Sequence, residues 1–152
     1  MVDLLRRALP EQIGAGCAGA GVAVRVLDLA AQFYVSCDQT ANTRRGEDPY
    51  TLWLAPDRAL QVGGAPPPGF VSDMSDGLAI FEITGPRAGE IVAMGCTLDH
   101  ALLAPGRCAQ TVFAGVKAII YSFGQVAFRI HVERQLATFT LQWLTQAATA
   151  LQ

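Results

Sequence analysis

A glycine-rich segment near the start of the chain fits a dinucleotide-binding pattern. Residues 14–19 (GAGCAG) match G-x-G-x-x-G, which binds a pyrophosphate when it lies between a strand and a helix. Residues 9–13 (LPEQI) do not resemble a buried strand, and Gly21 and a β-branched run follow instead of a helix. We therefore interpret residues 1–21 as a loosely ordered leader rather than a nucleotide site.

Cysteine, aspartate and histidine occur close together in the second half of the chain, and these types suit nucleophilic catalysis. They are Cys96, Asp99, His100 and Cys108. Asp99 and His100 are consecutive, however, and consecutive side chains seldom face each other. A polar loop after a helix stop at Gly95 explains them better, so we assign no catalytic residue here.

Two further polar groups have simpler interpretations than catalysis. Asp73 and Asp76 flank a serine just before an apolar run. Paired carboxylates can carry out acid–base chemistry, but Asp and Ser are also ordinary turn residues, and we expect a turn. His131 alternates with Arg129 and Glu133, which predicts a half-exposed polar strand face.

The cysteines predict no metal site. They are widely and irregularly spaced and form no C-x-x-C pair, whereas a zinc site needs closely spaced pairs of ligands. We expect reduced, mostly buried thiols in a cytoplasmic protein. The four residues are Cys17, Cys37, Cys96 and Cys108.

The composition is apolar for a globular domain. Hydrophobic residues make up 51% of the 152 residues, charged residues only 16%, and the net charge is −2. The sequence has no basic stripe, which excludes a nucleic-acid surface, and no uninterrupted apolar run of about 18 residues that would indicate a membrane span. The apolar excess indicates a surface buried against partner subunits; a core rich in alanine is the alternative.

Hydrophobic patterning predicts an α+β fold in a single domain, residues 1–152. The simplest architecture places helices on one face of a mostly antiparallel sheet. The predicted strands are 22–27, Tyr50–Ala55, Leu78–Thr84, 110–114, 116–121 and 125–132.

Two helices are predicted to cover that sheet. One spans residues 86–95, since proline is favoured in a first helical turn and glycine at a helix end. The other spans residues 134–151, where apolar side chains recur at three- and four-residue steps. We expect Phe139, Trp143 and Leu144 to face the sheet.

The remaining segments are predicted as connections. Residues 41–49 are polar and form a loop, and residues 63–69 (GGAPPPG) form a Gly- and Pro-rich internal loop. Asp57 is expected to cap one helical turn that runs to Gln61. Residues 29–33 suit either a strand or a helical turn.

Several segments, in this order along the chain, resemble one protein family. Residues 71–88 (VSDMSDGLAIFEITGPRA) look like the folate-binding domain shared by aminomethyltransferases and sarcosine oxidases. Residues 52–58 (LWLAPDR), 95–99 (GCTLD) and 105–111 (PGRCAQT) are similar to the gamma subunit of heterotetrameric sarcosine oxidases. The resemblance covers residues 40–150, approximately.

The resemblance implies a folate-binding (aminomethyltransferase-like) fold with a structural or assembly role. In such a complex the beta subunit oxidises the N-methyl group of sarcosine with flavin (FAD, FMN). The alpha subunit holds NAD and passes the carbon to tetrahydrofolate, and the delta subunit binds zinc. This chain would bind no cofactor and supply no catalytic residue. Its partners would be the alpha, beta and delta subunits, with Trp53 and Arg107 as interface candidates; when isolated, it would form a homodimer or expose an apolar patch.

Two alternatives stay open. Ala55 and Arg58 depart from the family pattern, which leaves room for a subunit of a related oxidase or dehydrogenase for another N-methyl amino acid. A stand-alone folate-binding or one-carbon transfer protein of the same fold would need a carboxylate and aromatic walls for the pterin. The residues of these types are Asp73, Asp76, Trp53 and Phe81.

Overall fold

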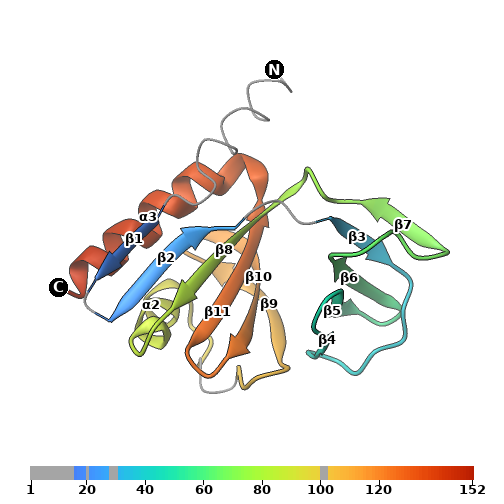
Figure 1. Ribbon diagram of the computed structural model, residues 1–152, viewed down its shortest axis with the longest axis horizontal. Helices are drawn as coiled ribbons and strands as arrows, with labels where there is room; N and C mark the ends of the chain where they lie inside the picture. Colours follow the sequence, from blue (N-terminus) through green and yellow to red (C-terminus); the bar gives the residue numbers. More distant parts are fainter. Residues whose placement is uncertain (1–15, 20, 28–30, 100–102) are drawn as a thin grey trace.

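Two antiparallel sheets make up most of the structure, a computed structural model that describes residues 16–19, 21–27, 31–99 and 103–152 (Figure 1). The larger sheet contains, in spatial order, β1 (Gly16–Gly19), β2 (Val22–Val26), β8 (Leu78–Thr84), β11 (Ala127–Glu133), β10 (Val116–Gly124) and β9 (Cys108–Phe113). The smaller contains β4 (Arg44–Gly46), β5 (Tyr50–Ala55), β6 (Arg58–Val62), β3 (Gln32–Val35) and β7 (Phe70–Asp73).

The six-stranded sheet is covered on both faces. Helices α2 (Ala88–Gly95) and α3 (Ala137–Ala150) pack on one face, and the five-stranded sheet packs against part of the other. Strand β8 contributes to both layers, with Phe81 in the cluster under the helices and Ile80 in the cluster between the sheets. Because successive side chains of a strand point to opposite faces, burial on both sides explains why β8 is a continuous apolar run.

The predicted fold class is confirmed in its main features: the elements are mixed, the sheets are antiparallel and both described helices lie on one face. Strands β5 and β8 have the predicted bounds. The prediction lacked the second sheet as a separate layer. Several of its strands are only three to five residues long, and such short apolar segments carry little periodic signal.

Two predicted connections contain strands. The helical turn expected after Asp57 is wrong, because this residue lies in a two-residue turn that pairs Ala55 with Arg58 and opens β6. Asp57 has a φ of 60°, a left-handed conformation that Asp tolerates. The predicted loop 41–49 contains β4.

The start of the described chain also differs from expectation. Residues 16–19, predicted as part of a loose leader, form β1 and pair with β2 as an antiparallel hairpin. This hairpin lacks the strand-to-helix context that a dinucleotide-binding loop needs. The rest of the predicted leader, residues 1–15 and 20, lies outside the described residues.

The other undecided or loop segments are simpler. Segment 29–33 reaches β3 from Gln32 onward, and residues 28–30 lie outside the described residues. Residues 63–69 connect β6 to β7 without a helix or strand.

The C-terminal helix is present, and its buried face is the predicted one at Leu144 and partly at Trp143, but not at Phe139. A 3-10 turn, η2 (Arg134–Leu136), leads into α3, whose Leu144 is fully buried. Phe139 is 47% exposed, because at 100° per residue it lies about 140° around the helix from Leu144. Trp143 is half-buried and meets Phe113 edge-on, with ring centroids 5.1 Å apart. Among the described helices, none is long and apolar enough to cross a membrane.

Truncation of α3 on its two sides should separate these faces. We expect Leu144→Ala to lower the free energy of unfolding by about 2–5 kcal/mol, because it leaves a cavity in the core. Phe139→Ala, on the exposed side of the same helix, should change it by less than about 0.5 kcal/mol. Urea unfolding of both variants measures this, and equal losses would contradict the assigned helix face.

Candidate functional site

A buried chain of hydrogen bonds joins the two sheets. Tyr121 Oη lies 2.8 Å from His131 Nε2, and His131 Nδ1 lies 2.7 Å from Gln32 Oε1. Tyr50 of the smaller sheet bonds to Tyr121 through its hydroxyl, and Arg129 Nη1 lies 3.4 Å from Tyr50 Oη. The tyrosines, histidine and glutamine are all buried.

The acceptor at one end fixes the direction of every bond in this chain. Gln32 Nε2 donates to the carbonyl of Leu78 at 3.1 Å, so Gln32 Oε1 is free to accept from His131 Nδ1–H. Burial keeps the imidazole neutral, so His131 Nε2 accepts from the Tyr121 hydroxyl, which in turn accepts from Tyr50. Arg129 donates into the other end. Both imidazole nitrogens are then satisfied.

Charges flank the Arg129 end of the chain. Glu82 accepts from Arg129 Nε at 3.0 Å and from Arg25 Nη2 at 2.8 Å, which ties β8 to its neighbours β11 and β2. The Arg129 guanidinium stacks 3.7 Å from the centroid of the Phe123 ring, and Arg44 lies 4.7 Å from the same centroid. Two cations thus approach one ring, and one of them is neutralised by Glu82.

Burial shifts the pKa values of three groups between the sheets, His131, Tyr121 and Cys108, further from neutral pH. Desolvation, with a smaller contribution from the charge of Arg129, lowers the pKa of His131 to about 3. Desolvation also raises the pKa of Tyr121 well above its ordinary value, and raises the pKa of the Cys108 thiol. A general base works best with a pKa near the operating pH, so His131 is too weak a base for that task. These groups hold the sheets together.

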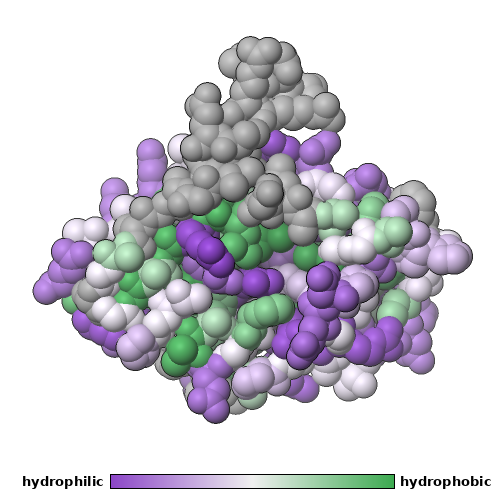
Figure 2. All heavy atoms as spheres, viewed as in Figure 1, coloured by the Kyte–Doolittle hydropathy of each residue, from purple (hydrophilic) through white to green (hydrophobic). Residues whose placement is uncertain are grey.

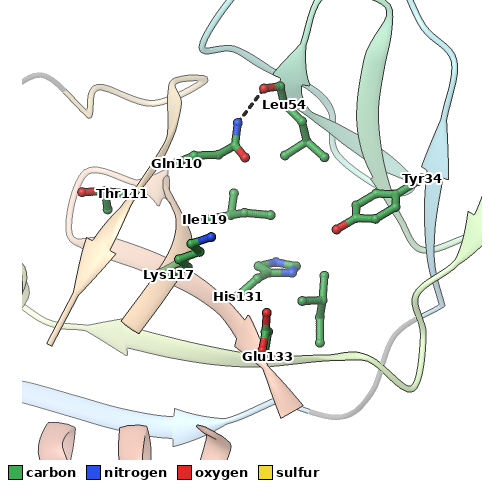
Figure 3. A pocket seen from close by; sticks show the side chains of 10 residues that line it. Tyr34, Leu54, Gln110, Thr111, Lys117, Ile119, His131 and Glu133 are labelled. Carbon is green, nitrogen blue, oxygen red and sulfur yellow. Dashed lines mark hydrogen bonds between the residues drawn. The ribbon is translucent and has the colours of Figure 1, made fainter. Parts of the chain in front are cut away.

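A cavity of about 370 Å³ opens between the sheets beside this chain (Figure 3). Leu54 and Ile119 supply apolar walls, and the Tyr34 hydroxyl points into the space. Lys117 and Glu133 bring opposite charges from the adjacent strands β10 and β11. The size and the mixed lining suit a small molecule or an inserted side chain.

The residues singled out for nucleophilic chemistry do not come together. Cys96 packs against the cluster under the helices, whereas Cys108 is buried in the cluster between the sheets, on the opposite side of the larger sheet. His100 lies outside the described residues. Within the described part of the chain, no three His, Cys, Asp or Glu side chains are placed to hold a metal ion.

Asp73 and Asp76 take the predicted turn roles. Hydrogen bonding by the Ser75 side chain, and next by the Ser75 backbone N–H, which donates to Asp73 Oδ1 at 2.9 Å, lowers the pKa of Asp73. Asp76 lies 3.5 Å from Arg134 Nη1. The candidate pterin-binding aromatics separate, because Phe81 is buried under the helices and Trp53 packs beside the cluster between the sheets.

The predicted half-exposed face of β11 is wrong at its centre. His131 is buried and Arg129 is mostly covered, because the second sheet packs over them, while Glu133 is exposed. Sequence patterning missed this site because Gln32 and His131 are 99 positions apart. The interface candidates lie where a partner can reach them: Arg107 is exposed and Trp53 is half-buried.

The fold matches that of one chain in a solved enzyme complex. A chain of the heterotetrameric sarcosine oxidase from Corynebacterium sp. U-96, in complex with pyrrole 2-carboxylate, aligns with a TM-score of 0.79 at 19% identity. The alignment covers 95% of this chain and 93% of that chain. This protein has the fold of a sarcosine oxidase chain. No family model and no curated protein matches the sequence.

The sarcosine oxidase fold thus extends over almost the full length of both chains. The resemblance predicted from the sequence is confirmed at the level of the fold. The order of motifs along the chain indicated this resemblance, although the identity is only 19% and no family model or curated protein matches the sequence.

The neutral, buried His131 should make stability depend on pH. Its pKa is about 3 when folded and 6.5 ordinarily, so between these values the unfolded chain binds more protons and stability falls as the pH falls. The contribution is complete above pH 6.5, and about 2 kcal/mol should be lost by about pH 5. His131→Gln should flatten this dependence in urea unfolding. His100→Gln, at the other histidine, should retain it, and three identical pH profiles would contradict the assignment.

Removing one hydroxyl should break the directed chain. Tyr121→Phe leaves His131 Nε2 without a donor and Tyr50 without an acceptor, which should cost about 1–3 kcal/mol of unfolding free energy. Tyr34→Phe, at the half-buried cavity wall, serves as the matched control and should cost less than about 0.5 kcal/mol. Calorimetric unfolding compares the two variants. An unchanged free energy of unfolding for Tyr121→Phe would show that the hydrogen-bond chain does not link the sheets.

Proposed function

We propose that this protein is the gamma subunit of a heterotetrameric sarcosine oxidase and serves the assembly of the complex. The observation that carries the proposal is the near end-to-end match with a chain of such a complex. Coverage of 95% of this chain and 93% of that chain is what equivalent subunits would give.

The proposed division of labour places the redox chemistry on other subunits. Flavin, NAD, tetrahydrofolate and zinc would bind to the alpha, beta and delta chains, and this chain would complete their cytoplasmic assembly. The buried polar groups support that role. His131 is neutral and hydrogen-bonded at both ring nitrogens, and burial raises the pKa of the Cys108 thiol. They support a rigid scaffold better than proton transfer or nucleophilic attack.

The surface also supports a subunit role. Figure 2 shows apolar and polar residues intermixed on the face viewed. Large apolar side chains that are roughly half exposed are Met94, Val112, Val126 and Phe139. Charged residues make up only 16% of the sequence, so they leave apolar area exposed on this surface. A partner subunit that covers this area removes it from water, which favours association.

A stand-alone folate-binding protein is the less supported reading. Its aromatic walls would have to line one pocket, yet Phe81 and Trp53 lie on opposite sides of the larger sheet. Isothermal titration of the isolated chain with tetrahydrofolate tests this reading directly, and micromolar binding would favour it over an assembly role.

Co-expression with the subunits encoded beside it should give a flavin-coloured complex that contains this chain. We expect Arg107→Glu to weaken assembly by roughly tenfold, because an exposed guanidinium suits a polar interface rim and its reversal repels the partner. Arg58→Glu, at an exposed position in the β5–β6 hairpin, is the control and should assemble normally.

Size-exclusion chromatography with absorbance of the flavin reads out the assembly. A chain that always elutes alone, without coloured partners, would overturn the proposed function. An unchanged complex with Arg107→Glu would remove only this residue from the interface.

A further inference from the structure

The larger sheet ends at β9, and the outer edge of this strand is only partly occupied. Phe113 and Val116 close the two-residue turn to β10, so the backbone groups of residues 109, 111 and 113 point toward β10. Those of residues 108, 110, 112 and 114 point outward. Two hydrogen bonds agree with this alternation, as the N–H groups of Cys108 and Ala114 both donate away from β10.

Both ends of the outer edge are already paired within the chain. Cys108 N–H donates to the carbonyl of Asn42 at 3.0 Å, and Ala114 N–H donates to the carbonyl of Gly95 at 2.8 Å. Between them, among the described residues, no backbone partner lies on the outward groups of Gln110 and Val112. The sheet thus presents a short row of two donors and two acceptors, framed by its own chain.

A groove with both polar and apolar lining runs beside this open segment. Its volume is about 520 Å³, and it is lined by the end of α2 on one side and by Thr111 and Val112 on the other. Met94 is 48% exposed and Val112 is 56% exposed. Exposed apolar side chains next to unsatisfied strand groups are unusual on an edge that faces water.

We propose that β9 receives an extended strand from another subunit, which pairs with the backbone groups of Gln110 and Val112 and lays an apolar side chain against Met94, on the α2 side of the edge. The proposal rests on the proposed function, since it assigns one contact of that complex. Only an extended backbone offers alternating donors and acceptors at the spacing of these four groups. Arg107, exposed just before β9, favours an acidic residue at that end of the incoming strand.

The geometry selects a single extended segment over a second copy of this chain. Two copies of β9 paired antiparallel would place residue 108 of each opposite residue 114 of the other. Asn42 occupies the position beside Cys108, and Gly95 occupies the position beside Ala114. The Asn42 segment of one copy and the Gly95 segment of the other would therefore compete for the same space, whereas a lone strand fits between them.

A proline at the open edge tests the contact. Val112→Pro removes an outward N–H that no strand of this chain uses, and edge positions of this kind accept proline. We expect assembly of the co-expressed complex to weaken at least about tenfold, because strand addition needs that donor. Val112→Thr keeps the donor and a β-branched shape, and should assemble within about twofold of the unchanged chain. The unfolding midpoint of the isolated Val112→Pro chain verifies that it folds.

Hydrogen exchange gives a second readout on the unsubstituted protein. The amides of Gln110 and Val112 should exchange rapidly in the isolated chain and slowly in the complex. Normal assembly of Val112→Pro, together with exchange of both amides in the unsubstituted complex as fast as in the isolated chain, would overturn strand addition and leave the subunit role intact. A chain that forms no complex at all would overturn the subunit role itself. Concentration-dependent dimers of the isolated chain with both amides protected would show that a second copy is the occupant.

Discussion

The structure depends on one directed chain of buried hydrogen bonds between its two sheets. An unpaired buried polar group would cost more free energy than its hydrogen bond contributes, so removing one member of the chain also destabilises its neighbours. The carbonyl of Leu78 terminates the chain, and this fixes the orientation of Gln32 and the neutral tautomer of His131. The five-stranded sheet is thereby held in one position over β8, β10 and β11.

Apolar packing, which has no directional requirement, holds the helices against the larger sheet. Helices α2 and α3 cover the far face of the same strands, where Phe81, Ile91 and Leu144 are fully buried. The layer between the sheets also contains an apolar cluster, which includes Leu60 and Ile80, and the hydrogen-bond chain crosses it. Apolar packing tolerates changes that keep volume, whereas the hydrogen-bond chain requires each partner to be present.

This division bears on function. A protein in which His131, Tyr50 and Tyr121 hold the layers together has rigid edges that other subunits can contact. Exposed side chains lie along one such edge, where Arg107 precedes β9, Val112 belongs to β9 and Met94 lies beside it. Preorganised edges lower the entropic cost of association, which suits a subunit whose role is to complete a larger assembly.

The sequence by itself determined the fold class, the strands β5 and β8, the two helices and the family resemblance, because each depends on local patterns or on motif order. Only the tertiary structure decided that His131 is buried, since the residues that cover it come from a second sheet whose short strands carry little signal. The tertiary structure also decided which side of α3 is buried, and this leaves Phe139 47% exposed. Periodicity indicates that a face is buried, but which side chains share that face, and with what polar partners, depends on contacts between residues far apart in the chain.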